Sequence, residues 1–274
     1  MKTLSDIIEY KKEEVNIKKK LLTLTQIKEE SSNYNPTRPF LKQIESNKSK
    51  ISIISEIKKA SPSKGVIRSD FNPLEIGQIY ERNGATCLSI LTDKKFFQGD
   101  DKFIKAVKSK VSLPILRKDF IIDEWQIEES RYLGADCILL ILSCLSFDQA
   151  KEYEEYAFSL GMNVIVEVHD LQELELANKL KAKLIGINNR NLKTMDVNIN
   201  TSINLINYIE KSKIPISESG ISNSKDLENL VQSGFNTFLI GEAFMKENNI
   251  DKMFKNLKAI DCLLYTSPSP RDCQ

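Results

Sequence analysis

Short apolar runs recur along most of the chain, and this repetition restricts the fold more than any other feature. Eight runs rich in Ile, Val and Leu begin at intervals of about 20 to 35 residues. Such runs are typical of parallel strands that are buried on both faces of a sheet. We therefore predict eight strands, at residues 51–57, 86–91, 114–118, 136–142, 163–168, 183–187, 214–218 and 237–240.

The segments between these runs have helical character, and several of them stop at a glycine just before the next run. These glycines are Gly84, Gly134, Gly161 and Gly234, and glycine is the common residue directly after a helix. No nucleotide-type glycine fingerprint follows the first run. Eight repeated strand–helix units without that fingerprint favour a closed (β/α)8 TIM barrel, an α/β fold, over an open doubly wound sheet.

The length fits one such barrel. A chain of 274 residues with 41% hydrophobic content can bury a full core as a single domain. We expect this domain to cover residues 1–261, with residues 1–48 as an N-terminal extension. That extension contains a charged amphipathic helix at 4–23 and a polar connector, and we expect it to cap one end of the barrel.

Residues 262–274 differ in character from what precedes them. This segment contains two Ser-Pro pairs after Tyr265 and Thr266, which is inconsistent with a continuing helix. It resembles the translation of a transposon-type sequencing adapter joined to a truncated reading frame. We expect a non-native tail without function, and a last native helix at 250–260.

Charge and cysteine content exclude several classes of partner and site. The 39 basic and 38 acidic residues nearly balance, which disfavours nucleic acid or an anionic membrane as a partner and favours a small molecule. The first twenty residues lack the apolar segment of a signal peptide, so we expect a cytoplasmic protein. Five cysteines without a Cys-x-x-Cys pair and one histidine argue against a zinc site or a Cys/His nucleophile, and we predict neither metal nor cofactor.

Polar side chains stand where five of the predicted strands end. In a TIM barrel the active site lies at the carboxyl ends of the strands. Side chains alternate between the two faces of a strand, so Glu56 and Lys58 share a face with Ile54, and Glu167 shares one with Ile165. These polar groups therefore continue the inward-facing rows. The set comprises Glu56, Lys58, Lys118, Glu167, Asn188 and Glu218.

Two glycine turns predict a phosphate site. Ser219-Gly220 follows the seventh predicted strand, and Gly241 follows the eighth. Loops at these places, with backbone N–H groups at the start of a short helix, form the usual phosphate site of TIM barrels. We expect the backbone of Glu242 to contribute while its side chain points away.

Five motifs lie in order on these strands and loops. They are Glu-Ile-Lys-Lys-Ala-Ser-Pro-Ser-Lys-Gly at 56–65, Leu-Thr-Asp at 91–93 with Phe-Phe-Gln-Gly at 96–99, Lys-Asp-Phe-Ile-Ile-Asp at 118–123, Gly-Ile-Asn-Asn-Arg-Asn-Leu at 186–192 and Ser-Glu-Ser-Gly-Ile at 217–221. With them the chain resembles the indole-3-glycerol-phosphate synthase family from about residue 4 to 260.

The resemblance implies a carboxy-lyase of tryptophan biosynthesis that closes, decarboxylates and dehydrates 1-(2-carboxyphenylamino)-1-deoxyribulose 5-phosphate. It assigns Lys118 as general acid and Glu167 as base, with Glu56 and Lys58 assisting. Asn188 and Glu218 are assigned to the sugar hydroxyls or to positioning these groups. Phosphate binding falls to Ser61, Arg190, Ser219, Gly220 and Gly241, and the aromatic pocket to Pro62, Phe97, Phe120 and Leu192.

Further expectations and alternatives accompany this assignment. The resemblance assigns no role to His169, two positions beyond Glu167. We expect a monomer that associates at most weakly with other tryptophan-pathway enzymes.

One alternative function is a Schiff-base aldolase using Lys58 or Lys118, although the position common for that lysine holds Asn188. A phosphosugar isomerase and a non-catalytic binding barrel are the others.

Overall fold

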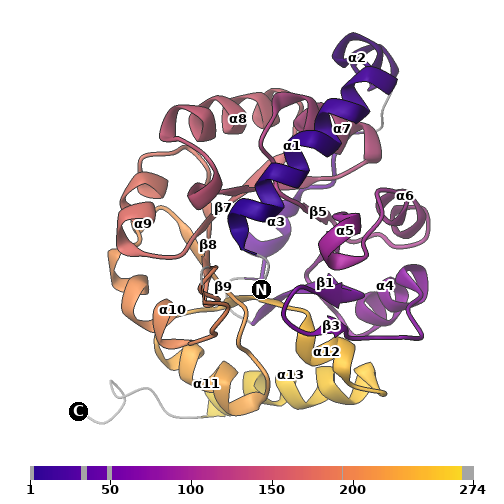
Figure 1. Cartoon of the computed structure of the whole chain (residues 1–274). Helices are drawn as coiled ribbons and strands as arrows, with labels where there is room; N and C mark the ends of the chain where they lie inside the picture. Colours follow the sequence, from indigo (N-terminus) through magenta and orange to yellow (C-terminus); the bar gives the residue numbers. More distant parts are fainter. Residues whose placement is uncertain (1–2, 32–35, 48–50, 193, 267–274) are drawn as a thin grey trace.

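The computed structural model describes residues 3–31, 36–47, 51–192 and 194–266. Eight parallel strands close into a barrel in the order β1-β10-β9-β8-β7-β6-β5-β4. In Figure 1 the strands lie inside a ring of helices. These strands are β1 (Ser52–Ile57), β4 (Cys87–Leu91), β5 (Ile115–Lys118), β6 (Cys137–Ile141), β7 (Asn163–Val168), β8 (Leu184–Asn188), β9 (Ile214–Glu218) and β10 (Thr237–Ile240). The predicted barrel is confirmed, and each predicted strand end lies within one residue of the observed one.

Helices surround the barrel on its outside (Figure 1). They are α4 (Pro73–Arg82), α5 (Lys94–Phe97), α6 (Lys102–Lys108), α7 (Glu124–Leu133), α8 (Phe147–Ser159), α9 (Leu171–Asn178), α10 (Asn200–Leu205), α11 (Ser224–Gln232), α12 (Glu242–Lys246) and α13 (Ile250–Thr266), with 3-10 turns η1 (Leu142–Cys144) and η2 (Ile206–Tyr208). The four predicted stop glycines have φ between 75° and 108°, a backbone region that favours glycine. None of the helices in the described ranges is both long and apolar enough to cross a membrane.

One element of the loop after β1 was not predicted. Strands β2 (Ala60–Ser61) and β3 (Gly65–Val66) pair antiparallel and form a short hairpin. Gly65 has a φ of +67° at the turn. The hairpin holds Ser61 and Pro62 beside the carboxyl end of β1.

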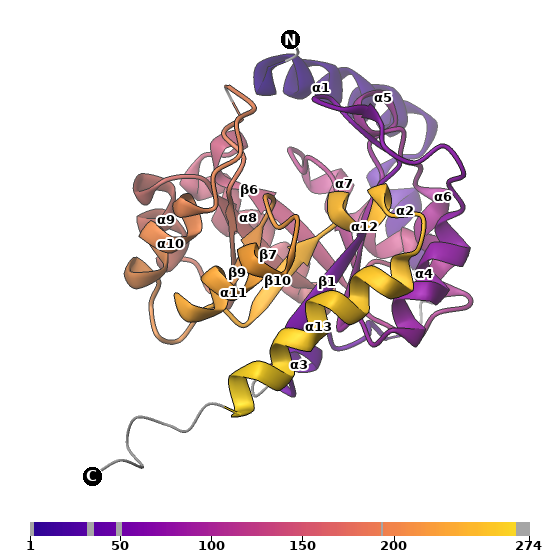
Figure 2. The ribbon, with the colours of Figure 1, turned by 90° about the horizontal axis from the view of Figure 1, so that it is seen from below.

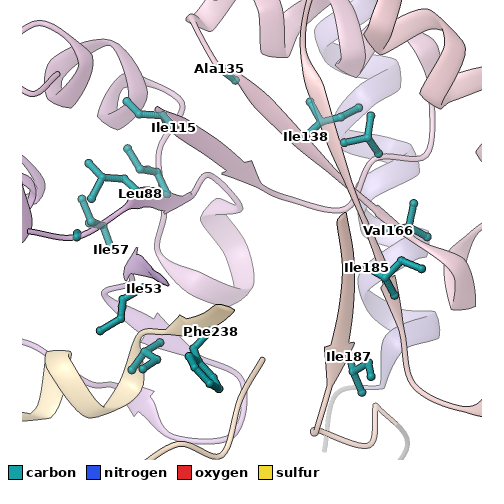
Figure 3. Close-up of a cluster of buried hydrophobic side chains, with 14 of the residues drawn as sticks. Ile53, Ile57, Leu88, Ile115, Ala135, Ile138, Val166, Ile185, Ile187 and Phe238 are labelled. Atoms are coloured by element: carbon teal, nitrogen blue, oxygen red, sulfur yellow. The ribbon is translucent and has the colours of Figure 1, made fainter. Parts of the chain in front are cut away.

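The core has two layers because strand residues alternate in direction. Outward-facing side chains pack between the strands and the helices, and Figure 3 shows examples such as Ile53, Leu88 and Phe238. Inward-facing side chains fill the barrel axis, among them Ile54, Leu116, Leu139, Ile165, Ile216 and Leu239. Above this inner layer the same inward rows turn polar.

The N-terminal extension covers both ends of the barrel, not one as expected. Helix α3 (Phe40–Glu45) places Phe40 and Ile44 in the inner core at the amino ends of the strands. Helix α1 (Leu4–Leu21), followed by α2 (Leu24–Ser31), lies across the opposite end, the mouth where the strands' carboxyl ends meet (Figure 2). Just before α3, the Thr37 hydroxyl donates a hydrogen bond to the carbonyl of Gly161 and the Arg38 backbone N–H donates one to Asp136.

The last helix is longer than the sequence suggested. Helix α13 continues to Thr266, six residues beyond the expected end. Residues 262–266 are Cys, Leu, Leu, Tyr and Thr, and their types tolerate helical backbone, whereas the first proline comes only at 268. The change in composition therefore does not coincide with the end of the helix.

We predict that residues 262–274 make no specific packing with the barrel, so their deletion should leave the melting temperature within a few degrees of the full chain. The matched comparison is deletion of 250–274, which also removes the buried Phe254 and Leu257 and should lower the melting temperature markedly. Thermal unfolding followed by circular dichroism measures both. A large drop for the shorter deletion would show that the tail belongs to the fold.

Candidate active site

The polar residues predicted at the strand ends gather around one cavity at the mouth of the barrel. Each of the six predicted catalytic residues lines it, as do the predicted phosphate and aromatic residues. They converge because the inward rows of neighbouring parallel strands end at the same level. Helix α1 closes part of the opening with Leu4 and Ile7.

Lys118 occupies the centre of this cluster. Its Nζ lies 2.7 Å from Oε2 of Glu167 and 3.4 Å from Oε2 of Glu218. The other oxygen of Glu167, Oε1, accepts a hydrogen bond of 3.0 Å from Nδ2 of Asn188. The carboxyl ends of four strands, β5, β7, β8 and β9, thus meet at the ion pair of Lys118 and Glu167.

Burial and charge together set the ionisation of the cluster. Burial lowers the pKa of Lys118, but the surrounding carboxylates outweigh it and raise that pKa, so the ammonium persists. Burial raises the pKa of Glu167, but Lys118 and His169 outweigh it and hold that pKa well below its usual range. Burial, opposed by Lys118 and assisted by Glu167 and Glu56, raises the pKa of Glu218 to about 8. The cluster therefore keeps Glu167 as a carboxylate at neutral pH, whereas Glu218 binds its proton more tightly than an ordinary glutamate.

Glu56 and Lys58 form a second pair at the end of β1. Their Oε2 and Nζ atoms are 2.5 Å apart. A Cβ atom at position 241 would lie 2.2 Å from Oε2 of Glu56, and one at position 186 would lie 2.0 Å from Oε1 of Glu218. Gly241 and Gly186 therefore provide the space that two catalytic candidates occupy.

An apolar slot lies beside the charged cluster. The rings of Phe97 and Phe120 stand 6.3 Å apart between centroids at an angle of 39°. Pro62 and Leu192 line the same cavity. Rings in this arrangement can hold a planar aromatic group by dispersion and edge contacts.

The predicted phosphate residues meet at another corner of the cavity. Ser219 and Gly220 both have positive φ, 66° and 86°, which turns the backbone after β9 sharply. The hydroxyl of Ser61 is buried and has no hydrogen-bond partner among the described residues. Arg190 binds the Ser63 hydroxyl and the carbonyl of Met195 through Nη1, at 3.3 and 3.1 Å. This corner therefore presents the unpartnered hydroxyl of Ser61 and the positioned guanidinium of Arg190 to a phosphate group.

Comparison with known proteins agrees with this arrangement. The family model described as indole-3-glycerol phosphate synthase matches residues 4–257. The chain belongs to the indole-3-glycerol phosphate synthase family. A relative of that name from Acinetobacter baylyi is 46% identical over 262 residues, covering 95% of this chain and 97% of the relative. Another from Polaromonas sp. is 44% identical over 260 residues, covering 94% and 98%.

Solved structures support the fold alone. 3-hexulose-6-phosphate synthase from Salmonella typhimurium superposes with a TM-score of 0.63 at 11% identity, covering 78% of this chain and 99% of that one. Thiamine phosphate pyrophosphorylase from Pyrococcus furiosus gives 0.56 at 16% identity, covering 80% and 98%. At such identities the similarity extends to the barrel and not to the chemistry.

One expectation about this member of the indole-3-glycerol phosphate synthase family is wrong. The side chain of Glu242 does not point away from the cavity but lines it. Its Oε2 lies 3.6 Å from Nη2 of Arg190, and its Oε1 lies 2.5 Å from Nζ of Lys246. Arg190 attracts the carboxylate toward the phosphate corner, an effect that strand alternation does not indicate.

A buried ion network beneath α1 was not predicted from the sequence. Lys11 is 2% exposed, and its Nζ lies 2.9 Å from both Asp93 and Asp119. Arg117, equally buried, contacts Asp119, and its Nη2 lies 2.7 Å from Glu129. This network fixes α1 over the mouth. A signal was present, because Ile7, Lys11 and Val15 form one buried helical stripe with a lysine in its middle.

Proposed function

We propose that this enzyme converts 1-(2-carboxyphenylamino)-1-deoxyribulose 5-phosphate to indole-3-glycerol phosphate, carbon dioxide and water in tryptophan biosynthesis, with the roles assigned below. The observation that carries these roles is the buried pair of Lys118 and Glu167, 2.7 Å apart, between an apolar slot and a phosphate corner. We also propose a cytoplasmic monomer that binds this small phosphorylated substrate and no nucleic acid.

Lys118 acts as the general acid of ring closure. The aromatic carbon that bears the carboxylate attacks the sugar ketone, and negative charge develops on the ketone oxygen. A proton positioned at that oxygen lowers the barrier. Lys118 has that proton to give because the carboxylate of Glu167, 2.7 Å away, keeps the lysine in its ammonium form. Loss of carbon dioxide then leaves a hydroxyl at the former ketone carbon.

Glu167 acts as the base of the dehydration that follows. The hydroxyl leaves as water with a proton supplied by Lys58, and the CH2 carbon beside the nitrogen loses a proton, which forms the aromatic pyrrole ring. Glu167 is ionised in the free site and is oriented by Asn188. Glu218, whose pKa is raised to about 8, holds a proton at neutral pH and can donate a hydrogen bond to a sugar hydroxyl. Glu56, paired with Lys58 at the end of β1, assists.

Two anchors orient the substrate. Pro62, Phe97, Phe120 and Leu192 hold the anthranilate ring, while Ser61, Arg190 and the backbone at Ser219, Gly220 and Gly241 hold the phosphate. Fixing both ends of the substrate places the attacking carbon against the ketone. The binding energy thereby covers the entropy cost of orienting the two reacting atoms.

The alternatives fit the site less well. A Schiff-base lysine must lose its proton to attack, which requires a lowered pKa, whereas the pKa of Lys118 is raised. The strand position common for such a lysine holds Asn188. A phosphosugar isomerase does not require an ammonium group paired with the base next to an aromatic slot. A non-catalytic binding barrel does not require a buried cluster of charged groups.

The activity is tested directly by mixing the protein with the proposed substrate and following indole fluorescence. We expect turnover without any added cofactor. Absence of fluorescence, with folding confirmed by circular dichroism, would refute the proposed reaction.

For phosphate binding we expect Ser61→Ala to raise KM roughly tenfold, the cost of one hydrogen bond to a charged group, with little change in stability. Its hydroxyl has no partner within the described part of the free protein, so only the bound state loses a contact. The inhibition constant of inorganic phosphate should rise with KM. Ser89→Ala is the matched control, because Ser89 also has a buried, unpartnered hydroxyl but lies outside the cavity lining. An unchanged KM for Ser61→Ala would place the phosphate elsewhere.

A further inference from the structure

His169 stands directly behind the proposed base, although the reaction assigned above does not use it. It follows β7, two residues after Glu167, and therefore shares its inward face. Its side chain is only 12% exposed. It is also the only histidine of the chain.

Helix α9 fixes the orientation of this ring. Oε2 of Glu173 lies 3.1 Å from Nδ1 of His169 and also accepts a 2.8 Å hydrogen bond from its backbone N–H. The hydroxyl of Ser143 lies 3.4 Å from the same Nδ1. With Nδ1 occupied in this way, the other ring nitrogen is directed at the active site.

That second nitrogen faces Glu167. Nε2 lies 3.3 Å from Oε1 of Glu167 and makes no hydrogen bond of good geometry within the described residues. The contact is therefore electrostatic. Glu167 then has three neighbours: Lys118 on Oε2, and Asn188 and His169 on Oε1.

The groups around His169 favour its charged form. Burial lowers the pKa of His169, but Glu167 from β7 and Glu173 from α9 outweigh it and raise that pKa to about 9. Cys144 of η1 is neutral there, since burial raises the pKa of its thiol to about 12. Lys118 lies on the far side of Glu167. Imidazolium between two carboxylates is the form expected at neutral pH.

We propose that His169, held by Glu173, is a positioning residue that keeps Glu167 ionised and oriented after Lys118 has given its proton to the substrate. This inference rests on the acid and base roles proposed above. When the N–H proton of Lys118 moves to the ketone oxygen, the lysine becomes neutral and no longer balances the charge of Glu167. The imidazolium remains beside Oε1 and retains that balance until the dehydration step.

Nuclear magnetic resonance can test the pairing without any turnover, because a single histidine gives a single set of imidazole signals. We expect the ring to titrate with a pKa of about 9, and Glu173→Gln or Glu167→Gln to lower it by at least about one unit each. Glutamine at 173 can still accept the backbone N–H, so the fold is retained. A wild-type pKa near 6.5, or no shift in Glu173→Gln, would overturn the proposal whether or not the enzymatic assignment holds.

Single-turnover kinetics test the consequence. In Glu173→Gln and His169→Gln we expect carbon dioxide to form at the normal rate while indole appears several-fold later, with KM unchanged. Glu175→Gln is the matched control, because Glu175 lies exposed on the same helix and should change neither product. If both products slow equally in Glu173→Gln, or only KM changes, His169 does not act through the base.

Discussion

Lys118→Ala should slow ring closure by about 10²-fold or more, because it removes the proton donor to the ketone oxygen at the first step. Both carbon dioxide and indole should be delayed together, and no intermediate should accumulate. The substitution also leaves Glu167 and Glu218 without the ammonium that lies 2.7 and 3.4 Å away. The measurement is the rate of carbon dioxide release with enzyme in excess over substrate.

Lys118→Arg separates proton donation from charge. Arginine keeps a cation near Glu167 but does not give up its proton at accessible pH. We expect it to be as slow in ring closure as Lys118→Ala. Near-normal rates in Lys118→Arg would mean that position 118 supplies only a positive charge, and the general-acid role would be wrong.

Glu167→Gln should lower the rate of indole formation by roughly 10²- to 10³-fold, because the amide keeps the size of the side chain but cannot accept the ring proton. The interactions of Lys118 with Glu218 and the binding residues remain, so KM should change little. Glu173→Gln serves for comparison, since it leaves the base in place and should produce a much smaller loss. Equal losses in the two variants would remove Glu167 from the role of base.

Local signals explain why the barrel was predictable. A parallel strand covered on both faces must be apolar at nearly every position, and a helix that ends at a left-handed residue favours glycine. Gly134, which ends α7, and Cys137–Ile141 show both kinds of signal within eight residues. The alternation of side chains along a strand then placed Glu56 and Glu167 inside the barrel. This prediction needs no knowledge of a distant partner, because the direction of each side chain follows from its position in its own strand.

The features that the sequence did not reveal depend on contacts between distant segments. Lys11 belongs to the roof of the site because Asp93 and Asp119, more than 80 residues away, take up its charge. Glu242 turns toward the cavity because Arg190 attracts its carboxylate. His169 faces the base because Glu173 holds its other nitrogen. In each case the side chain's direction is set by a partner's charge, which strand and helix periods do not encode.

The order of product release in Glu167→Gln tests the division of roles between Lys118 and Glu167 most directly. Single-turnover experiments would follow carbon dioxide and indole separately in this variant, with Lys118→Ala measured alongside. We expect Glu167→Gln to release carbon dioxide at nearly the normal rate and to form indole far later, whereas Lys118→Ala delays both. Simultaneous delay of both products in Glu167→Gln, or normal carbon dioxide release in Lys118→Ala, would contradict the assignment of acid and base.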